Sequence, residues 1–286
     1  IKGDEIIYKN YWGEFSENFP TNSFSMAKSV VSILIGVALD EGKIKTLDTS
    51  IGAYLPEYRN SDITIRHLLW MSSGLDWTES AQNPFSDNAE AYYGENLNGL
   101  VLSQNLIQPP GKTFKYLSGN SQLLALILEK STGQSVSSYA EEKIWKKIGA
   151  QHPAFWSLDN DKGIEKAFCC LYAIPKDYAK IGRLLLNNGH LNGQQIVSKK
   201  YLSEALFPNP TLEENGKRNK RYGMHFWMGE YQKERFFNLQ GVYGQYVIVL
   251  PKSNLIIVRT GSKREKKDET GLPKDLYKYI EIAKRM

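Results

Sequence analysis

The longest hydrophobic stretch of the chain predicts a helix that is buried on all sides. From Met26 to Asp40 apolar residues fill nearly every position, and Gly42 ends the stretch. A surface helix would carry a polar face that recurs about every 3.6 residues. Because this stretch has no such face, we expect it to run through the interior of the fold and to begin next to Ser25.

Helical spacing of apolar residues also marks the middle of the chain, where loops rich in Gly and Pro separate the stretches. The predicted helices there are Ile65–Met71, Asn98–Leu106, Ser121–Lys130, Tyr139–Lys147, Asp177–Leu186 and Ser198–Leu206. This part of the chain is therefore expected to be mainly helical.

Strand-like patterns, rich in β-branched and aromatic residues, occur near both ends of the chain. The predicted strands are Glu5–Trp12, Tyr222–Tyr231, Arg235–Gln240, Gln245–Leu250 and Leu255–Thr260, and an amphipathic helix follows from Leu276 to about Lys284. The order of elements predicts an α/β fold of the α+β type, with a hairpin-linked antiparallel sheet and helices between its parts.

Length and composition fit one catalytic unit with two lobes. The chain has 286 residues, of which 41% are hydrophobic and 23% charged, as in an ordinary globular protein. We divide it into a discontinuous sheet domain (residues 1–50 and 195–286) and a mainly helical domain (residues 51–194), with the active site in the cleft between them. No apolar run reaches the roughly 20 residues that span a bilayer, so no transmembrane segment is predicted.

The net charge of +5 does not indicate a nucleic-acid partner, because basic and acidic residues alternate along the chain. The densest basic run, residues 263–267, is followed at once by Asp268 and Glu269. The chain starts at Ile1 without an initiator methionine, and we keep open an upstream signal or anchor, as in a periplasmic or secreted protein. The oligomeric state is left open.

Neither a metal site nor a disulfide is predicted. Cys169 and Cys170 are adjacent, and since a disulfide between neighbours strains the intervening peptide, we expect two free thiols. The chain has neither a CxxC pair nor an HExxH helix, and its four histidines are far apart in sequence.

The first candidate chemistry lies at the start of the buried helix, where Ser25 and Lys28 form the S-x-x-K pattern of the chain. Residues three apart on a helix share a face, so the Lys28 amine can reach the Ser25 hydroxyl. Burial and the helix dipole should both lower the pKa of Lys28 and allow it to act as a base. The alternative is that Ser25 only caps the helix and Lys28 is exposed. A lysine in front of an apolar helix opposes the dipole, which favours the functional interpretation.

Two further segments carry candidate chemistry. Tyr116 begins the segment Tyr116–Asn120 between a Pro-Gly loop and an apolar helix, and its hydroxyl could relay a proton to a leaving group. The alternative is a turn tyrosine packed on the core. Gly241 and Val242 open a glycine-containing turn before a strand, where the Val242 N–H could bind an oxyanion beside the N–H of Ser25. The alternative is a glycine bulge without function.

In this order, the three motifs resemble those of the penicillin-recognising serine hydrolases. The similarity is greatest to the branch that holds class C β-lactamases, D-alanyl-D-alanine carboxypeptidases, related esterases and aminohexanoate hydrolases. Segments such as Thr64–Leu69 and Ser72–Leu75 are also similar to stretches of that branch. The resemblance covers nearly the whole chain and implies an antiparallel sheet with an inserted helical lobe.

The resemblance implies Ser25 as nucleophile, Lys28 as base and Tyr116 as proton relay, with the N–H groups of Ser25 and Val242 as the oxyanion hole. It implies neither a metal nor an organic cofactor. Substrate contacts are expected from four residues: Ser118, Asn120, Gly241 and Gln245.

Two departures from the family pattern bear on the substrate. The tyrosine motif of β-lactamases is Tyr-x-Asn, but here Ser118 takes the third position. Their Lys-Thr-Gly strand motif appears as Leu239-Gln240-Gly241, without the basic residue that would meet a carboxylate. We therefore expect a serine esterase or amidase for a small acyl substrate. A β-lactamase or D-alanyl-D-alanine carboxypeptidase is the alternative, and a catalytically silent ligand-binding relative is the second alternative.

Overall fold

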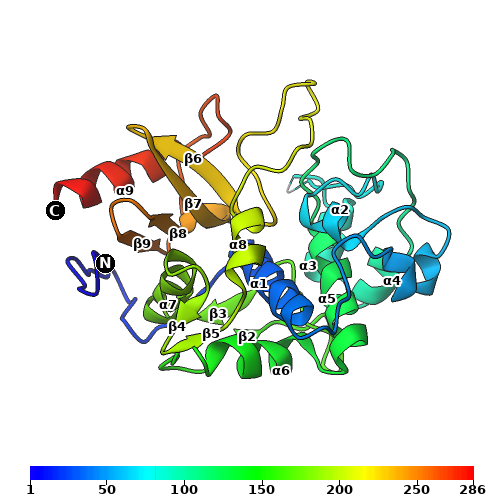
Figure 1. The fold of residues 1–286 in the computed structure, drawn as a ribbon, viewed down its shortest axis with the longest axis horizontal. Helices are drawn as coiled ribbons and strands as arrows, with labels where there is room; N and C mark the ends of the chain where they lie inside the picture. The colour runs from blue at the N-terminus through cyan, green and yellow to red at the C-terminus, as the bar shows by residue number, and fades with distance from the viewer. Residues whose placement is uncertain (81) are drawn as a thin grey trace.

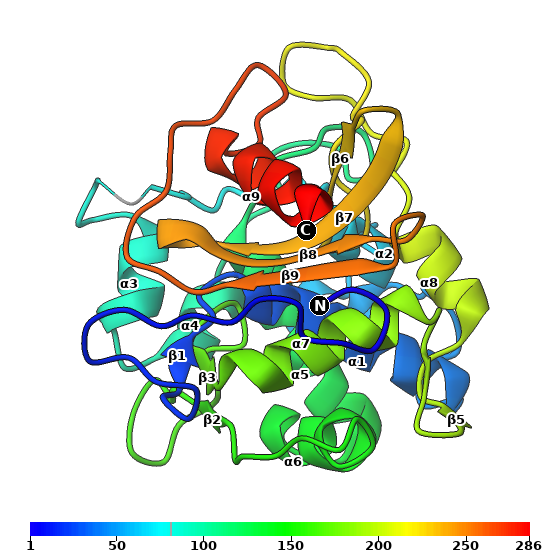
Figure 2. The ribbon, with the colours of Figure 1, turned by 90° about the vertical axis from the view of Figure 1, so that its left-hand side faces the viewer.

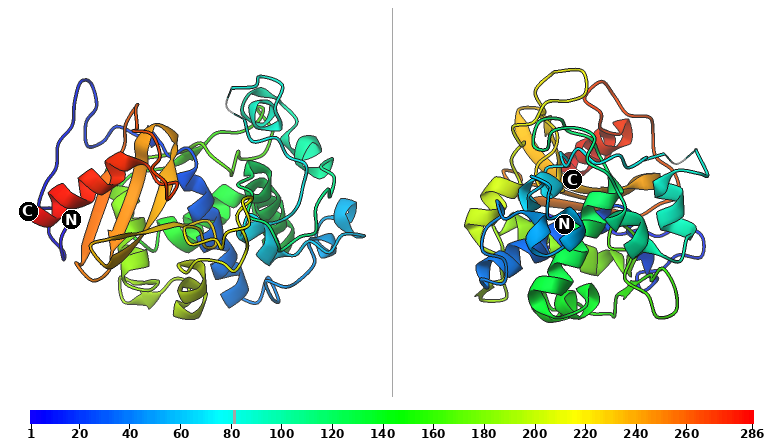
Figure 3. Two further views of the ribbon diagram at one scale, coloured as in Figure 1. Left: turned by 90° about the horizontal axis from the view of Figure 1, so that it is seen from above. Right: turned by 90° about the vertical axis from the view of Figure 1, so that its right-hand side faces the viewer.

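The computed structural model describes residues 1–80 and 82–286 and shows a layered arrangement (Figure 1). The C-terminal helix α9 (Lys274–Arg285) covers one face of a four-stranded sheet, and α7 (Pro175–Leu186) packs against the other face. The long helix α1 (Met26–Asp40) follows, and the helices α2 to α5 lie beyond it, as the view from above shows (Figure 3). The predicted fold class is confirmed.

Helices make up most of the lobe beyond α1. They are α2 (Ile65–Leu69), α3 (Asp87–Tyr93), α4 (Leu97–Leu102), α5 (Ser118–Thr132) and α6 (Val136–Ala140), and α8 (Lys199–Ala205) follows nearer the sheet. Thr64, Ser86 and Ser135 each precede one of these helices and accept a backbone N–H of its first turn. Side-chain caps therefore mark the starts of these three helices.

The main sheet is antiparallel, and its strands follow one another in chain order (Figure 2). They are β6 (Trp227–Tyr231), β7 (Glu234–Gly241), β8 (Gln245–Leu250) and β9 (Leu255–Arg259). Alternation along the strands divides the side chains between two cores: Leu239 and Val247 join the core that contains α1, while Tyr246 and Ile248 join the core under α9. The turn between β7 and β8 closes where Gly241 pairs with Gln245.

Two small sheets complete the architecture. The first contains β1 (Thr21–Asn22), β3 (Leu171–Ala173) and β2 (Phe155–Trp156), and the second is the hairpin of β4 (His190–Leu191) and β5 (Gln194–Gln195). The first sheet ties the segment before α1 to the segment before α7, and so fixes the approach to Ser25.

Helix α1 has the bounds that the sequence predicts, and every residue from Met26 to Ala38 is buried. Its polar side chains find partners inside the fold: Ser29 Oγ donates to the backbone oxygen of His225 across 2.6 Å, and Ser32 Oγ donates to that of Met224 across 2.7 Å. A fully buried helix can carry these hydroxyls because each is hydrogen-bonded.

Several predicted elements need correction. Residues 5–12 form no strand, because only Ile1 and Lys2 reach the sheet, at the edge of β9, and the side chains of Tyr8 and Trp12 stay exposed. The strand predicted from Tyr222 begins at Trp227. The helix predicted over 139–147 is the end of α6 and a π-helical turn at Glu141–Trp145. Helix α7, expected in the helical lobe, packs on β8 and β9.

The cysteine prediction is wrong, since Cys169 and Cys170 are joined by a disulfide bond. Cys170 has a left-handed backbone with φ of +65°. Both residues are buried directly before β3.

In the part of the chain that the structure describes, no helix is both long enough and apolar enough to span a membrane.

Candidate active site

Ser25 sits at the N-terminus of α1, but its side chain does not cap the helix. Phe24 before it has a left-handed backbone with φ of +46°, and this turn delivers Ser25 to the helix end. No hydrogen bond within the described residues takes up the Ser25 N–H. The Ser25 hydroxyl instead lies 3.1 Å from Lys28 Nζ. The interpretation of Ser25 as a helix cap is therefore wrong.

Lys28 is 1% exposed, which also contradicts the alternative of an exposed first-turn lysine. Its amine donates to Ser25 Oγ and, across 2.7 Å, to the backbone oxygen of Phe168. Burial lowers the pKa of Lys28 from its usual 10.5 to about 8, and the negative charge of Glu79 opposes this effect. A buried amine with this pKa can exchange a proton with the neighbouring hydroxyl near neutral pH.

The structure brings Tyr116 to the same place. Lys28 Nζ lies 5.1 Å from the centre of the Tyr116 ring. Burial raises the pKa of Tyr116 well above its ordinary value of 10, and the nearby Ser25 hydroxyl opposes the rise. Tyr116 is therefore protonated at neutral pH and can donate a hydrogen bond toward the Ser25 region.

Aromatic packing fixes the Tyr116 ring. Trp227 lies 5.5 Å from it between ring centres, and Tyr222 meets it edge-on at 5.9 Å. Tyr222 and Trp227 are themselves perpendicular at 4.8 Å, an arrangement that aromatic pairs favour. The position of Tyr116 thus depends on residues about 100 positions further along the chain.

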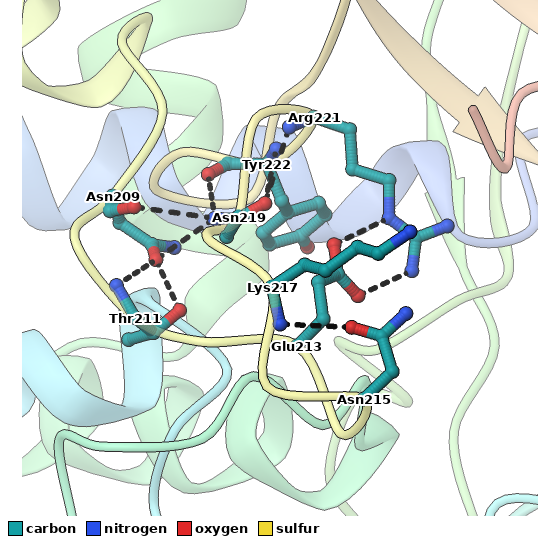
Figure 4. A network of polar contacts seen from close by, with 8 residues as sticks. All are labelled: Asn209, Thr211, Glu213, Asn215, Lys217, Asn219, Arg221 and Tyr222. Carbon is teal, nitrogen blue, oxygen red and sulfur yellow. Dashed lines mark hydrogen bonds and ion pairs between the residues drawn. The ribbon is translucent and has the colours of Figure 1, made fainter.

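A polar network in the loop before β6 holds Tyr222 (Figure 4). The Asn219 side chain accepts the Tyr222 N–H and donates to the Tyr222 backbone oxygen, and it also bonds to Asn209. Arg221 forms two hydrogen bonds to the carboxylate of Glu213 in the same loop. The network keeps this loop, which has little regular structure, in one conformation over the aromatic residues.

The turn at Gly241 and Val242 lies against the segment before Ser25. A side chain on Gly241 would place its Cβ 2.4 Å from the backbone oxygen of Ser23, so only glycine allows this approach. The rings of Phe24 and Tyr243 also meet, with centres 5.4 Å apart. The two predicted oxyanion donors, Ser25 and Val242, thus belong to backbone segments in direct contact.

Gln245 stabilises this turn through side-chain hydrogen bonds to the backbone. Its carboxamide donates to the Gly261 and Val242 backbone oxygens and accepts the Gly261 N–H, and the residue is buried. We predicted a substrate contact for Gln245, but its polar atoms are occupied by the backbone.

Ser118 and Asn120 make contacts within the protein as well. Asn120 is fully buried and accepts from Ser73 Oγ across 2.7 Å. Ser118 donates both its backbone N–H and its hydroxyl to the carboxylate of Glu79, each across 2.7 Å. Both predicted substrate contacts therefore have a structural partner, and Glu79 is an exposed residue at this position.

Several residues of this site carry no motif that sequence reasoning could have used. Glu79, Phe168, and the pair His225 and Trp227 come from three separate segments, and only the fold brings them near Lys28 and Tyr116. His225 accepts from or donates to Ser121 across 2.9 Å and has Leu69 O at 3.1 Å. Because a carbonyl oxygen only accepts, Nδ1 of His225 carries the proton and Nε2 accepts from Ser121.

Basic side chains approach the site from the loop after β9. Lys267 Nζ lies 5.4 Å from the Trp227 ring, and the charge of Arg264 is near enough to Tyr116 to lower its pKa. Arg221, on the same side, is neutralised by Glu213, whereas no ion pair within residues 1–80 and 82–286 involves Arg264 or Lys267. The Leu239–Gly241 motif has no basic residue, but the loop after β9 therefore brings positive charge near Trp227 and Tyr116.

Comparison with known proteins places the chain in a family. Residues 1–276 match the beta-lactamase family. A 6-aminohexanoate-dimer hydrolase of Paenarthrobacter ureafaciens is 22% identical over 92% of this chain and 71% of its own length.

Solved structures share the fold over most of the chain. A Bacillus anthracis protein assigned as a 6-aminohexanoate-dimer hydrolase superposes with a TM-score of 0.86 at 24% identity, over 100% of this chain and 78% of that one. A family VIII carboxylesterase has a TM-score of 0.73 at 20% identity, over 93% and 83% of the two chains. Because the family match covers nearly the whole chain, the chain belongs to the beta-lactamase family, whose members are serine hydrolases.

Proposed function

We propose that this protein cleaves an ester or amide bond of a small acyl substrate through a covalent acyl-enzyme on Ser25. The observation that carries the proposal is the 3.1 Å contact between Ser25 Oγ and a buried Lys28 at the start of α1. A serine whose hydroxyl meets a lysine of lowered pKa is an activated nucleophile.

Each step of the proposed reaction has a group to perform it. Neutral Lys28 takes the Ser25 proton while Oγ bonds to the substrate carbonyl carbon, and the N–H groups of Ser25 and Val242 bind the resulting oxyanion. Lys28 then returns the proton through Tyr116 to the leaving alcohol or amine as the carbonyl re-forms. Water hydrolyses the acyl-enzyme by the same steps in reverse and restores Ser25.

The test is hydrolysis of p-nitrophenyl acetate and butyrate by the wild type and by Ser25→Ala, with mass spectrometry of the peptide that contains Ser25. We expect turnover and an acyl adduct that Ser25→Ala abolishes. Ser103→Ala, which changes an exposed serine, is the matched control and should keep both. Equal rates for wild type and Ser25→Ala, without an adduct, would overturn the proposal.

A β-lactamase or D-alanyl-D-alanine carboxypeptidase remains the second candidate, and one observation favours it. Arg264 and Lys267, which form no ion pair with any described residue, bring positive charge near Trp227 and Tyr116, and such charge can bind the carboxylate that these substrates carry. Turnover of nitrocefin and labelling by a fluorescent penicillin, both weakened in Arg264→Ala and Lys267→Ala, would support this candidate. If the wild type neither turns over nitrocefin nor is labelled by the penicillin, this second candidate is excluded and the esterase or amidase function is the one left to test.

We also propose that the protein works in an oxidising compartment, such as the periplasm or the cell exterior. The Cys169–Cys170 disulfide supports this, because such bonds persist mainly outside the reducing cytosol. Iodoacetamide added to the denatured, unreduced protein should label neither cysteine, whereas prior reduction should expose both. Labelling without reduction, in protein from its native source, would contradict the proposal.

A further inference from the structure

The loop after Trp77 places a carboxylate at the site that no motif of the sequence indicates. Glu79 accepts three hydrogen bonds: from Trp77 Nε1 across 2.8 Å, and from the N–H and hydroxyl of Ser118 across 2.7 Å each. The residue is otherwise exposed. Its carboxylate therefore joins this loop to the first residue of α5.

This contact stabilises the segment that carries Tyr116. Leu117, the residue at the N-cap of α5, offers no side-chain cap, so Glu79 supplies the missing acceptor from another part of the chain. A negative charge at a helix N-terminus also interacts favourably with the helix dipole. Trp77 packs so closely beneath that a Cβ on Gly119 would lie 2.6 Å from its ring. The turn that positions Tyr116 is thus fixed by Trp77 and Glu79 together.

The charge of Glu79 also acts on the proton-transfer groups, because its carboxylate binds Ser118, two residues from Tyr116, and the Tyr116 ring centre lies 5.1 Å from Lys28 Nζ. It raises the pKa of Lys28 and of Tyr116, and it is the only carboxylate among the described residues that acts on Lys28 in this way. Burial alone would drive the amine toward its neutral form. Glu79 opposes burial and so stabilises the ammonium that Lys28 becomes when it takes the proton of Ser25.

We propose that Glu79 is a positioning residue for this reaction: through Ser118 it holds Tyr116 in place, and its charge stabilises the protonated Lys28 formed during acylation. The proposal rests on the proposed function of Ser25. It has two separable parts, a contact and a charge, and the chain offers a substitution for each.

The experiment compares Glu79→Gln, Ser118→Ala and the control Glu90→Gln, which removes a carboxylate from the same lobe without a contact to the site. The pH dependence of kcat for p-nitrophenyl butyrate is measured for each, after circular dichroism has shown that each is folded. In parallel, 13C NMR follows the titration of the Lys28 side chain, which needs no turnover.

Glu79→Gln keeps an oxygen for Ser118 but loses the negative charge. The pH at which kcat rises and the pKa of Lys28 measured by NMR should therefore both fall by about half a pH unit or more. Ser118→Ala should leave both at the wild-type pH and lower kcat by roughly tenfold, because Tyr116 loses support. Glu90→Gln should match the wild type.

If Lys28 has the same pKa in Glu79→Gln as in the wild type, the charge part of the proposal is wrong. If Ser118→Ala has the same kcat as the wild type, the contact part is wrong. Either failure is distinct from failure of the proposed function, which would appear as a wild-type protein without a Ser25 adduct. In that case the Lys28 titration still decides whether Glu79 acts on the amine.

Discussion

Lys28 donates a hydrogen bond of 2.7 Å to the backbone oxygen of Phe168, a residue 140 positions away in the chain. The bond holds the amine on the side of α1 where Ser25 and Tyr116 lie. A lysine has four flexible side-chain bonds, so without such an anchor its amine would sample many positions. The S-x-x-K motif provides the two groups, and the Phe168 carbonyl fixes their geometry.

The rate of ester hydrolysis should rise with pH and level off above about pH 8. Lys28 must be neutral to accept the Ser25 proton, and burial lowers its pKa to about 8. The kcat/KM of p-nitrophenyl butyrate between pH 6 and 9.5, corrected for spontaneous hydrolysis, measures this. A flat profile across that range would show that Lys28 is not the base.

Lys28 should also make stability depend on alkaline pH. Between pH 8 and 10.5 the unfolded chain binds a proton on Lys28 that the folded protein does not, so the wild type gains stability as pH rises. Relative to Lys28→Met, the gain should be about 3 kcal/mol across this window. Urea unfolding of both proteins at several pH values measures the difference, and parallel pH curves would contradict the prediction.

His225 should make the protein sensitive to acid. Burial, followed by the charge of Lys28, lowers its pKa from 6.5 to about 3. Below pH 6.5 the unfolded chain takes up a proton that the folded protein excludes, so stability falls by up to about 1.4 kcal/mol for each pH unit. His225→Asn should flatten this decline, since asparagine tolerates the left-handed backbone at this position and does not titrate. Chemical unfolding of both proteins between pH 4 and 7 is the measurement, and equal slopes would count against the prediction.

Gly241→Ala should impair activity far more than folding. The added Cβ would lie 2.4 Å from the Ser23 backbone oxygen and push the Val242 turn away from Ser25. Loss of one oxyanion donor costs roughly 100-fold or more in kcat. Steady-state kinetics with p-nitrophenyl butyrate and a thermal melt test this together. A folded variant with wild-type kcat would remove Val242 from the proposed oxyanion hole.

The sequence by itself determined the elements with strong local signals. The apolar run of α1 predicts its bounds without error, because a helix that is apolar on all sides must be buried along its length and the run ends just before Gly42. The hairpin strands β7 to β9 follow equally from alternation and turn residues. The strand predicted from Glu5 to Trp12 is absent, since a segment of high strand propensity forms a strand only beside a partner strand, and the fold offers none there.

The tertiary structure decided the partners of the site. The S-x-x-K motif and Tyr116 can be read from sequence, but the residues that hold them cannot. Phe168 contacts α1, and Glu79 contacts α5, only because the tertiary fold brings distant parts of the chain together. The roles of Asn120 and Gln245 show the same limit: a polar residue near a motif can face substrate or backbone, and only burial and hydrogen-bond geometry distinguish these. Local sequence sets which groups are present, and long-range packing sets where their polar atoms point.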